Sequence, residues 1–217
     1  MIGYVPPPDR GLAIVFADAS LLIVDKPAGL LSVPGRGADK QDCLLSRVQA
    51  KFADALTVHR LDMSTSGLLL LARGAAMQSE LSRLFRERQV DKRYLAEVEG
   101  CLASDAGEVD LPLICDWPNR PRQKVDFEVG KRSLTRYRTL SRDVATQSSR
   151  VELEPVTGRS HQLRVHLASL GHPIIGDELY GSGSLESGER LRLHATELRF
   201  VHPLSGAPLH FHCEAPF

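Results

Sequence analysis

Residues 59–72 read HRLDMSTSGLLLLA. The second half of this segment is an unbroken apolar run over 68–72, entered from Gly67, which predicts a short strand buried on both faces. The first half is polar, and its Ser, Thr and Gly residues favour a tight loop whose side chains bond their own backbone. A carboxylate fixed in such a loop, here Asp62, can act as a nucleophile or a base. The simpler alternative is that Asp62 only caps a turn, and the pattern alone favours that alternative.

Two later segments combine regular patterning with polar residues. Residues 92–98 alternate as a strand does, with Tyr94 on the same face as Ala96 and Val98, although a strand Tyr is usually a packing residue. Residues 158–164 read GRSHQLR and lead into a helical apolar stripe that ends at Gly171.

Together these segments resemble the sequence motifs of the RluA family of pseudouridine synthases: HRLD with TSG at 59–67, Lys-x-Tyr at 92–94 and GRSHQLR at 158–164. The resemblance begins at about residue 25, where KPAGL occupies 26–30, and continues to residue 217. It implies an α+β fold, with a mixed, largely antiparallel sheet, helices on its faces and a central cleft. It also implies an isomerase that converts uridine to pseudouridine in RNA and uses no metal and no organic cofactor.

The resemblance further implies the roles of three residues. Asp62 would be the catalytic carboxylate, Tyr94 would lie against it, and Arg164 would pair with it. A buried Asp ionises readily only beside a cation, and an Arg keeps its proton and can fork onto a carboxylate. Whether Asp62 attacks the base, attacks the sugar or abstracts a sugar proton stays open.

RNA binding is expected from a second group of residues. Tyr94 offers a ring on which an unstacked base can rest, Arg60 can fill the gap that a flipped nucleotide leaves, and His59 is expected to hydrogen-bond within the loop. The full set of expected RNA contacts is Arg60, His59, Arg159, Trp117, Arg120, Arg122 and Lys124.

The charge distribution is uneven although the net charge is zero. Residues 116–142 hold eight Lys or Arg and three Asp or Glu, a local excess of about five positive charges that can track phosphates. A solvated surface is the common alternative for such a run. Within it, residues 110–125 are rich in Pro and basic residues and predict a long surface loop around Trp117.

Periodicity predicts the remaining elements. Residues 12–16 and 21–24 should pair as a hairpin, Asp42 should cap a helix that runs to Phe52, and residues 75–88 should form a second helix. Two further strands are expected at 135–140 and 150–155.

Composition and termini suggest one catalytic domain over 1–217, with no N-terminal S4 domain. The first eight residues lack a signal-peptide pattern, no run is long enough for a membrane helix, and the four scattered cysteines suit a reducing compartment. We therefore expect a cytoplasmic monomer with no membrane partner. The resemblance implies two RNA substrates, 23S rRNA and the anticodon stem-loop of tRNA, which the residues alone do not establish.

Three rival functions are weaker. A hydrolase could use Ser160 and His161 with Asp62, but the serine lacks the second glycine of a nucleophile elbow. A zinc site could use His210, His212 and Cys213, but no second ligand pair stands at the right spacing. A non-catalytic RNA-binding module has no need of an Asp beside phosphates.

Overall fold

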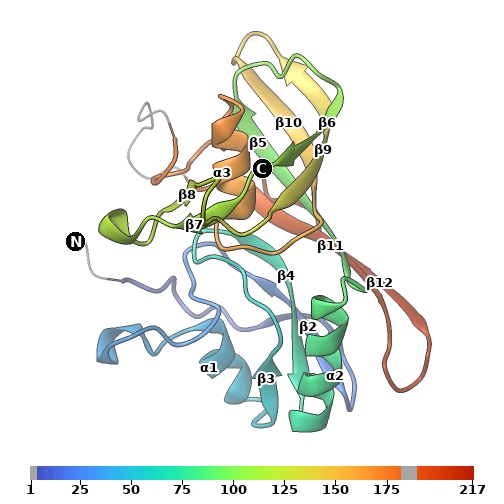
Figure 1. The fold of residues 1–217 in the computed structure, drawn as a ribbon. Helices are drawn as coiled ribbons and strands as arrows, with labels where there is room; N and C mark the ends of the chain where they lie inside the picture. The colour runs from blue at the N-terminus through green and yellow to red at the C-terminus, as the bar shows by residue number, and fades with distance from the viewer. Residues whose placement is uncertain (1–3, 182–189) are drawn as a thin grey trace. The chain divides into compact units, whose positions relative to one another are not determined.

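The computed structural model describes residues 4–181 and 190–217. The chain forms two compact units (Figure 1). Unit 1 comprises Met1–Lys92 and His194–Pro216, and unit 2 comprises Arg93–Leu193 with Phe217. Each unit combines strands with helices, as the α+β prediction requires. The single-domain organisation stays a prediction.

Unit 1 is a sheet with helices. Its strand order is β1-β2-β4-β11, and β12 extends the sheet beyond β11. The pairs are antiparallel except for β4 with β11, and β3 pairs with the far end of β4. The strands are β1 (Ala13–Ala17), β2 (Leu21–Lys26), β3 (Ala55–Thr57), β4 (Ser66–Arg73), β11 (Leu193–Val201) and β12 (Pro208–His212), and the helices are η1 (Ala38–Lys40), α1 (Leu44–Gln49) and α2 (Ala75–Arg86).

Strand β4 is the centre of unit 1, and it is buried on both faces as predicted. Leu68, Leu70 and Ala72 pack with side chains of α2 in one core cluster. Leu69 and Leu71 alternate to the opposite face and are equally inaccessible to solvent. Full burial of each such leucine contributes about 1.5–3 kcal/mol to the stability of the unit.

The predicted hairpin and the predicted helix at 75–88 are confirmed as β1–β2 and α2. The predicted cap of α1 is wrong. Cys43, and not Asp42, is the N-cap, because Cys43 and Ser46 exchange side-chain and backbone hydrogen bonds in a capping box. Asp42 instead pairs with Arg47 at 2.7 Å, and α1 ends at Gln49, short of Phe52.

Unit 2 is built on four antiparallel strands in the order β5-β10-β9-β6. These are β5 (Asp91–Glu99), β6 (Ala106–Asp110), β9 (Leu134–Asp143) and β10 (Ser148–Pro155). Helix α3 (Gln162–Ser169) packs Leu163 and Leu167 against the core side chains of β5 and β10. Three predictions are confirmed here: the strand at 92–98, the pair at 135–140 and 150–155, and the helix that ends before Gly171.

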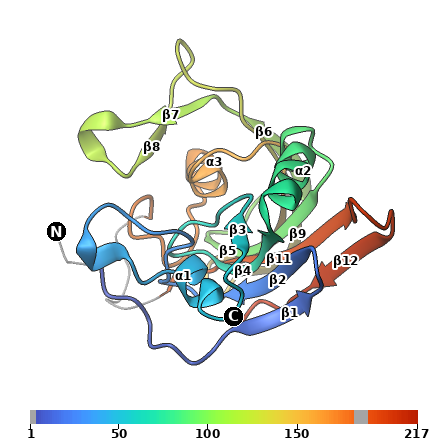
Figure 2. The ribbon, with the colours of Figure 1, turned by 90° about the horizontal axis from the view of Figure 1, so that it is seen from below.

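The segment 110–125 is not the long loop that its prolines suggested. Strands β7 (Leu113–Cys115) and β8 (Gln123–Val125) pair as a separate two-stranded ribbon (Figure 2), joined through the short turn η2 (Trp117–Asn119). The prolines lie at 112, 118 and 121, outside the paired residues, so their missing N–H groups remove no ladder hydrogen bond. We call residues 113–125 the basic hairpin.

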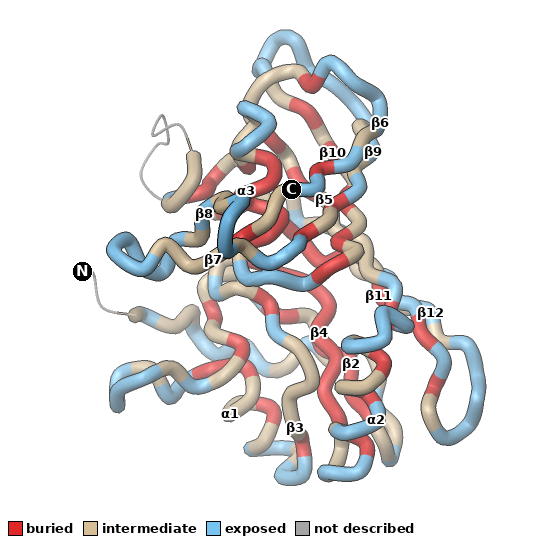
Figure 3. Tube along the Cα trace, in the orientation of Figure 1, coloured by how far each residue is buried: buried red, intermediate tan, exposed pale blue. Residues whose placement is uncertain are grey.

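The segments of the chain differ in how far they are buried. Buried positions follow β4 and α3, whereas the tip of the basic hairpin is exposed (Figure 3). No helix within residues 4–181 and 190–217 has the length and apolar character needed to cross a membrane.

Candidate active site

Asp62 lies in the loop between β3 and β4, four residues before the start of β4. The loop is a tight turn, because the backbone N–H of Thr65 donates to the carbonyl oxygen of Asp62 at 3.1 Å. Thr65 itself is buried, while the Asp62 side chain is partly accessible. The geometry therefore holds the backbone of Asp62 in a turn and leaves its carboxylate within reach of a ligand.

Lys26 fixes the loop on the C-terminal side of Asp62. Its ammonium group is completely buried and donates to three carbonyl oxygens, those of Pro27 (2.9 Å), Leu30 (2.7 Å) and Met63 (3.0 Å). An ammonium group has three N–H donors, so this set uses each of them. The N–H of Gly29 also donates to the Met63 carbonyl at 2.9 Å. Met63 is thus joined to segment 26–30 by two hydrogen bonds.

Ser32 fixes the loop on the other side of Asp62. Its hydroxyl donates to the carbonyl of Leu61 at 2.7 Å and accepts from the N–H of Leu61 at 3.2 Å. Both chain neighbours of Asp62 are therefore held by the segment 26–32. Sequence reasoning missed Lys26 and Ser32 as positioning residues, although the KPAGL motif placed a lysine at the end of a buried strand.

His59 is a structural acceptor, as expected for a loop hydrogen-bonder. The N–H of Leu70 donates to Nε2 of His59 at 2.9 Å, and the imidazole stacks on Phe85 with ring centroids 4.4 Å apart. Burial, assisted by the nearby charge of Lys92, lowers the pKa of His59 to about 3. The ring is therefore neutral at physiological pH. RNA contact through His59 stays a prediction, as it does for the exposed Arg60.

The start of β4 is locked to β11. The hydroxyl of Ser66 is hydrogen-bonded to Nδ1 of His194 at 2.8 Å, and both side chains are buried. Gly67 has a φ of +110°, and a Cβ at this position would lie 2.4 Å from the carbonyl oxygen of Ala195. Only glycine allows the two strands to approach this closely, so the Asp62 loop leads directly into a rigid pairing.

In unit 2, Arg164 forms a buried bidentate ion pair with Asp177. The Nε–Oδ2 and Nη2–Oδ1 distances are 2.7 and 2.6 Å, and the two residues are 4% and 2% exposed. Sequence reasoning gave Arg164 a carboxylate partner but did not find Asp177, which directly follows Gly176. Pairing of Arg164 with Asp62, which lies in the other unit, stays a prediction.

Asp177 also organises the turn that follows it. Its Oδ1 accepts from the N–H groups of Leu179 (2.9 Å) and Tyr180 (3.1 Å). The hydroxyl of Tyr180 then accepts from the N–H of Gln123 at 2.7 Å and is hydrogen-bonded to Nδ1 of His161 at 2.8 Å. The basic hairpin is therefore connected to α3 through Tyr180.

Tyr94 lies on β5 opposite Leu153 of β10 and packs, partly buried, against the core of unit 2. Its predicted role as a stacking platform for a base stays a prediction. Because Tyr94 belongs to unit 2 and Asp62 to unit 1, their proximity also stays a prediction.

Half of the basic residues in the run at 116–142 pair with acidic residues outside it. Arg132, just before β9, and three arginines of β9 pair with acidic residues of β6, of β10 or of the segment before β6. The pairs are Arg132–Asp110 (3.5 Å), Arg136–Glu108 (2.7 Å), Arg138–Glu152 (3.2 Å) and Arg142–Asp105 (2.7 Å). The local excess of about five charges therefore overstates what this face offers to phosphates, and β9 is better described as a solvated, ion-paired surface.

The tip of the basic hairpin differs from β9. Trp117 is 68% exposed, and the guanidinium carbon of Arg120 lies 4.0 Å from its ring centroid. Arg122 is also exposed, and the described residues supply neither arginine with an ion pair. Lys124 pairs with Asp126 at 3.3 Å, and Arg159 donates to the Arg132 carbonyl at 3.3 Å. The tip thus retains an aromatic ring and two arginines for an external ligand.

The rejected zinc site does not assemble. His210 and His212 both contact Glu197 of β11, at 3.4 and 3.8 Å. Cys213 follows His212 directly, so it alternates to the opposite face and packs against the unit 1 core.

Comparisons with known proteins agree with these motifs. The family model described as RNA pseudouridylate synthase matches residues 20–169. The dual-specificity RNA pseudouridine synthase RluA of Yersinia pestis is 51% identical over 207 residues, which cover 95% of this chain and 100% of that protein. The protein of the same name from Haemophilus influenzae is 48% identical, with 100% and 99% covered.

A solved structure is similar as well. Human RNA Pseudouridylate Synthase Domain Containing 1 superposes with a TM-score of 0.81 at 31% identity, covering 98% of this chain and 87% of that one. The pseudouridine synthase fold expected from the sequence is thereby confirmed.

Proposed function

This chain belongs to the RNA pseudouridylate synthase family, and we propose that it isomerises uridines in two kinds of RNA, 23S rRNA and the anticodon stem-loop of tRNA, with Asp62 as the catalytic carboxylate. The observation that carries the role of Asp62 is the double anchoring of its loop by Lys26 and Ser32. The similar proteins of Yersinia pestis and Haemophilus influenzae are both named dual-specificity RNA pseudouridine synthases, which supports the pair of substrates.

The reaction sets what the site must provide. Isomerisation breaks the bond from C1′ to N1, turns the base over and joins C1′ to C5, after which the C5 proton leaves and N1 takes up a proton. Reactants and product have the same atoms and oxidation state, so the reaction itself consumes no oxidant and no water. The chemistry requires an oriented carboxylate, and an anchored loop supplies that orientation without further ordering during the reaction.

The other roles follow the family motifs. We assign Tyr94 to stacking on the flipped base, Arg60 to the gap that this base leaves, and Arg164 to stabilising the ionised form of Asp62. The tip of the basic hairpin, with Trp117 and Arg120, would contact the RNA outside the reacting nucleotide. The protein would act as a cytoplasmic monomer.

Asp62→Asn tests the central assignment. The substitution preserves size and removes the negative charge, so turnover should fall by at least ~10³-fold while RNA affinity and thermal stability stay near wild type. Tritium release from C5-tritiated RNA measures turnover, and Asp39→Asn, at an exposed position, is the matched control. Release by Asp62→Asn at more than a trace of the wild-type rate would contradict the assignment.

The two substrates are tested separately. The protein is incubated with C5-tritiated tRNA in one reaction and with 23S rRNA in another, and the modified positions are mapped in each. We expect one modified uridine in the tRNA anticodon stem-loop and at least one in the rRNA. Modification of only one RNA would reject dual specificity without affecting the role of Asp62.

Arg164 is paired with Asp177, so an experiment must separate this structural role from its proposed role toward Asp62. Arg164→Met alone should reduce turnover strongly and destabilise the protein by about 3–5 kcal/mol, since it leaves a buried carboxylate without its partner. The double variant Arg164→Met with Asp177→Asn removes both charges, keeps an Oδ1 that accepts from the N–H groups of Leu179 and Tyr180, and should recover most of the stability. If Arg164 serves Asp62, turnover stays low in the double variant. Recovery of turnover together with stability would show that Arg164 only positions Asp177.

A further inference from the structure

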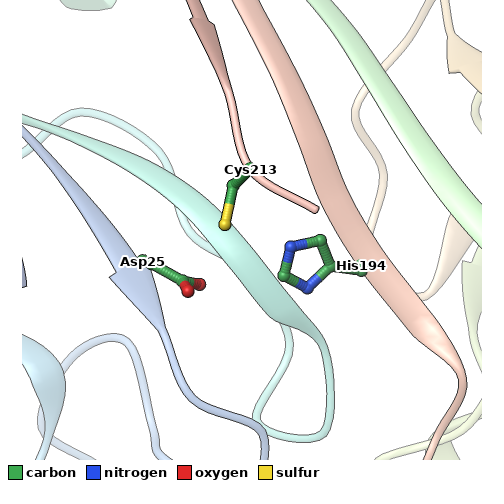
Figure 4. A group of neighbouring side chains, drawn as sticks. All are labelled: Asp25, His194 and Cys213. Carbon is green, nitrogen blue, oxygen red and sulfur yellow. The ribbon is translucent and has the colours of Figure 1, made fainter. Parts of the chain in front are cut away.

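Three potential metal ligands converge at one end of the unit 1 core. Asp25 lies on β2, His194 on β11 and Cys213 directly after β12, and their side chains point toward one another (Figure 4). The sheet register explains this. Asp25 pairs with Leu68 of β4, and His194 pairs with Ser66, which lies two residues before Leu68 on the same strand. Because residues two apart on a strand point to the same face, the side chains of Asp25 and His194 lie on one face of the sheet.

Cys213 reaches the same face from the edge of the sheet. Its N–H donates to the carbonyl of Thr196 at 2.9 Å, which continues the pairing of β12 with β11 by one residue. Potential ligand atoms of Asp25, His194 and Cys213 all lie within 4.8 Å of one another. Ligands of a tetrahedral zinc ion lie roughly 3.5 Å apart, so rotations of side chains would be sufficient to close the site.

The histidine is already oriented as metal-binding histidines are. Its Nδ1 is hydrogen-bonded to Ser66 at 2.8 Å, which directs the opposite ring nitrogen, Nε2, as the ligand atom. Such an outer partner on the second nitrogen fixes the tautomer and the ring plane. The His194 side chain is 1% exposed, so its orientation is also set by packing.

The donor set identifies the class of ion. A thiolate and an imidazole favour zinc and related transition metals, whereas Mg²⁺ and Ca²⁺ prefer sites made only of oxygen. We propose that Asp25, His194 and Cys213 bind one Zn²⁺ ion, with a water molecule as the fourth ligand. This site is separate from the chemistry of Asp62, which needs no metal.

Binding changes the protonation of one ligand. Burial, together with the nearby charge of Asp25, raises the pKa of Cys213 to about 11, so without metal the thiol is protonated. Zn²⁺ replaces that proton, which leaves to solvent, and the Cys213 sulfur forms a bond to the metal. The bound ion would link β2, β11 and the residue after β12 at the end of the sheet where β4 begins.

Cobalt provides a direct probe of the sulfur ligand. Co²⁺ added to the full-length, metal-free protein should produce a near-ultraviolet thiolate-to-metal charge-transfer band, which added Zn²⁺ then removes. Cys213→Ser should abolish the band, and Asp25→Asn and His194→Gln should each weaken Co²⁺ binding by at least ~10-fold. Cys115→Ser, which changes another partly buried cysteine, and the double variant His210→Gln with His212→Gln should bind as wild type does.

A second measurement covers variants that fold poorly. Zn²⁺ should raise the thermal unfolding midpoint of the wild type and of Cys115→Ser, and should not raise that of Cys213→Ala. No band in the wild type, or a band that survives in Cys213→Ser, would overturn the proposal. A Zn²⁺-induced stabilisation that Cys213→Ala retains would overturn it as well.

Discussion

The Asp62 loop and the basic hairpin are both polar segments for which we propose functional roles, yet they are held in opposite ways. The loop is joined to segment 26–32 by hydrogen bonds from a buried lysine and a buried serine. The hairpin is held by its own short ladder, by the bridge between Leu113 and Lys131, and by the hydrogen bond from the N–H of Gln123 to Tyr180, and its tip faces solvent.

This difference in anchoring suits two different tasks, the positioning of a reacting carboxylate and the binding of RNA phosphates. A carboxylate that takes part in bond breaking must already be in place when the substrate arrives, because misplacement by 1 Å can cost about 10²-fold in rate. A phosphate contact tolerates more movement, since its energy comes from charge and from released counterions. Substitutions in the loop supports should therefore affect stability and turnover, whereas substitutions at the hairpin tip should affect affinity.

The largest effect is expected for Lys26→Met. Methionine keeps much of the aliphatic length and removes all three hydrogen bonds, which leaves three carbonyl groups without that donor. We expect a loss of about 2–4 kcal/mol in the free energy of unfolding and a drop in turnover of at least ~10-fold. Chemical denaturation and tritium release measure the two quantities.

Lys51→Met is the control for this change, because Lys51 is exposed. Its stability and turnover should match those of the wild type. A Lys26→Met protein with unchanged turnover would show that the anchoring of Met63 is irrelevant to catalysis, and the contrast between loop and hairpin would then fail.

The next effect concerns pH and His59. Its folded-state pKa is about 3, whereas the unfolded chain binds a proton near the ordinary histidine value of 6.5. Between these values the unfolded state binds more protons, so stability is fully present above about pH 6.5 and declines as the pH falls toward 3. Denaturation between pH 7 and 5 should therefore show a shallower pH dependence for His59→Gln than for the wild type.

The matched control for His59→Gln is His210→Gln, at an exposed position on β12. It should keep the wild-type slope. Equal slopes for the wild type and His59→Gln would show that His59 is not the buried neutral acceptor described above, and that the loop is less firmly packed than its contacts indicate.

The smallest effect on the fold is expected at the hairpin tip. Changing Arg120, Arg122 and Lys124 together to Ala should alter the unfolding free energy little, because all three are exposed. RNA binding should weaken, and the slope of log affinity against log salt should fall by up to about two, at about 0.7 per lost contact. The rate at saturating RNA should be unchanged. An unaltered salt slope would place the RNA on another surface.

The sequence predicted the parts of the site whose causes are local. Four consecutive leucines after a polar loop were sufficient for β4, and the rare order of residue types around Asp62 was sufficient for its resemblance to a catalytic motif. The supports of Asp62 were not predicted, because Lys26 and Ser32 are 37 and 29 residues from their partners Met63 and Leu61. Such contacts depend on how strands are registered, which periodicity does not specify.

The same limit explains the charge run. The arginines of β9 are close in sequence and looked like one basic patch, but antiparallel pairing brings Glu108 of β6 and Glu152 of β10 against them. Likewise, residues 113–125 were read as a loop from their prolines, whereas the positions of those prolines outside the ladder allow a hairpin. Composition describes one segment by itself, whereas strand pairing decides which side chains of other segments lie beside it.

The neighbours of β4 have a consequence for how the protein is made. On one side β4 pairs with β2, which precedes it, but the partner at its N-terminal end is β11, which the ribosome synthesises more than a hundred residues later. Leu198 and Phe200 of β11 also complete the core beneath α2. A nascent chain that already contains Asp62 therefore lacks the strand that locks the start of β4. Activity should appear only after residues 193–213 have emerged, so the enzyme is silent during most of its own translation.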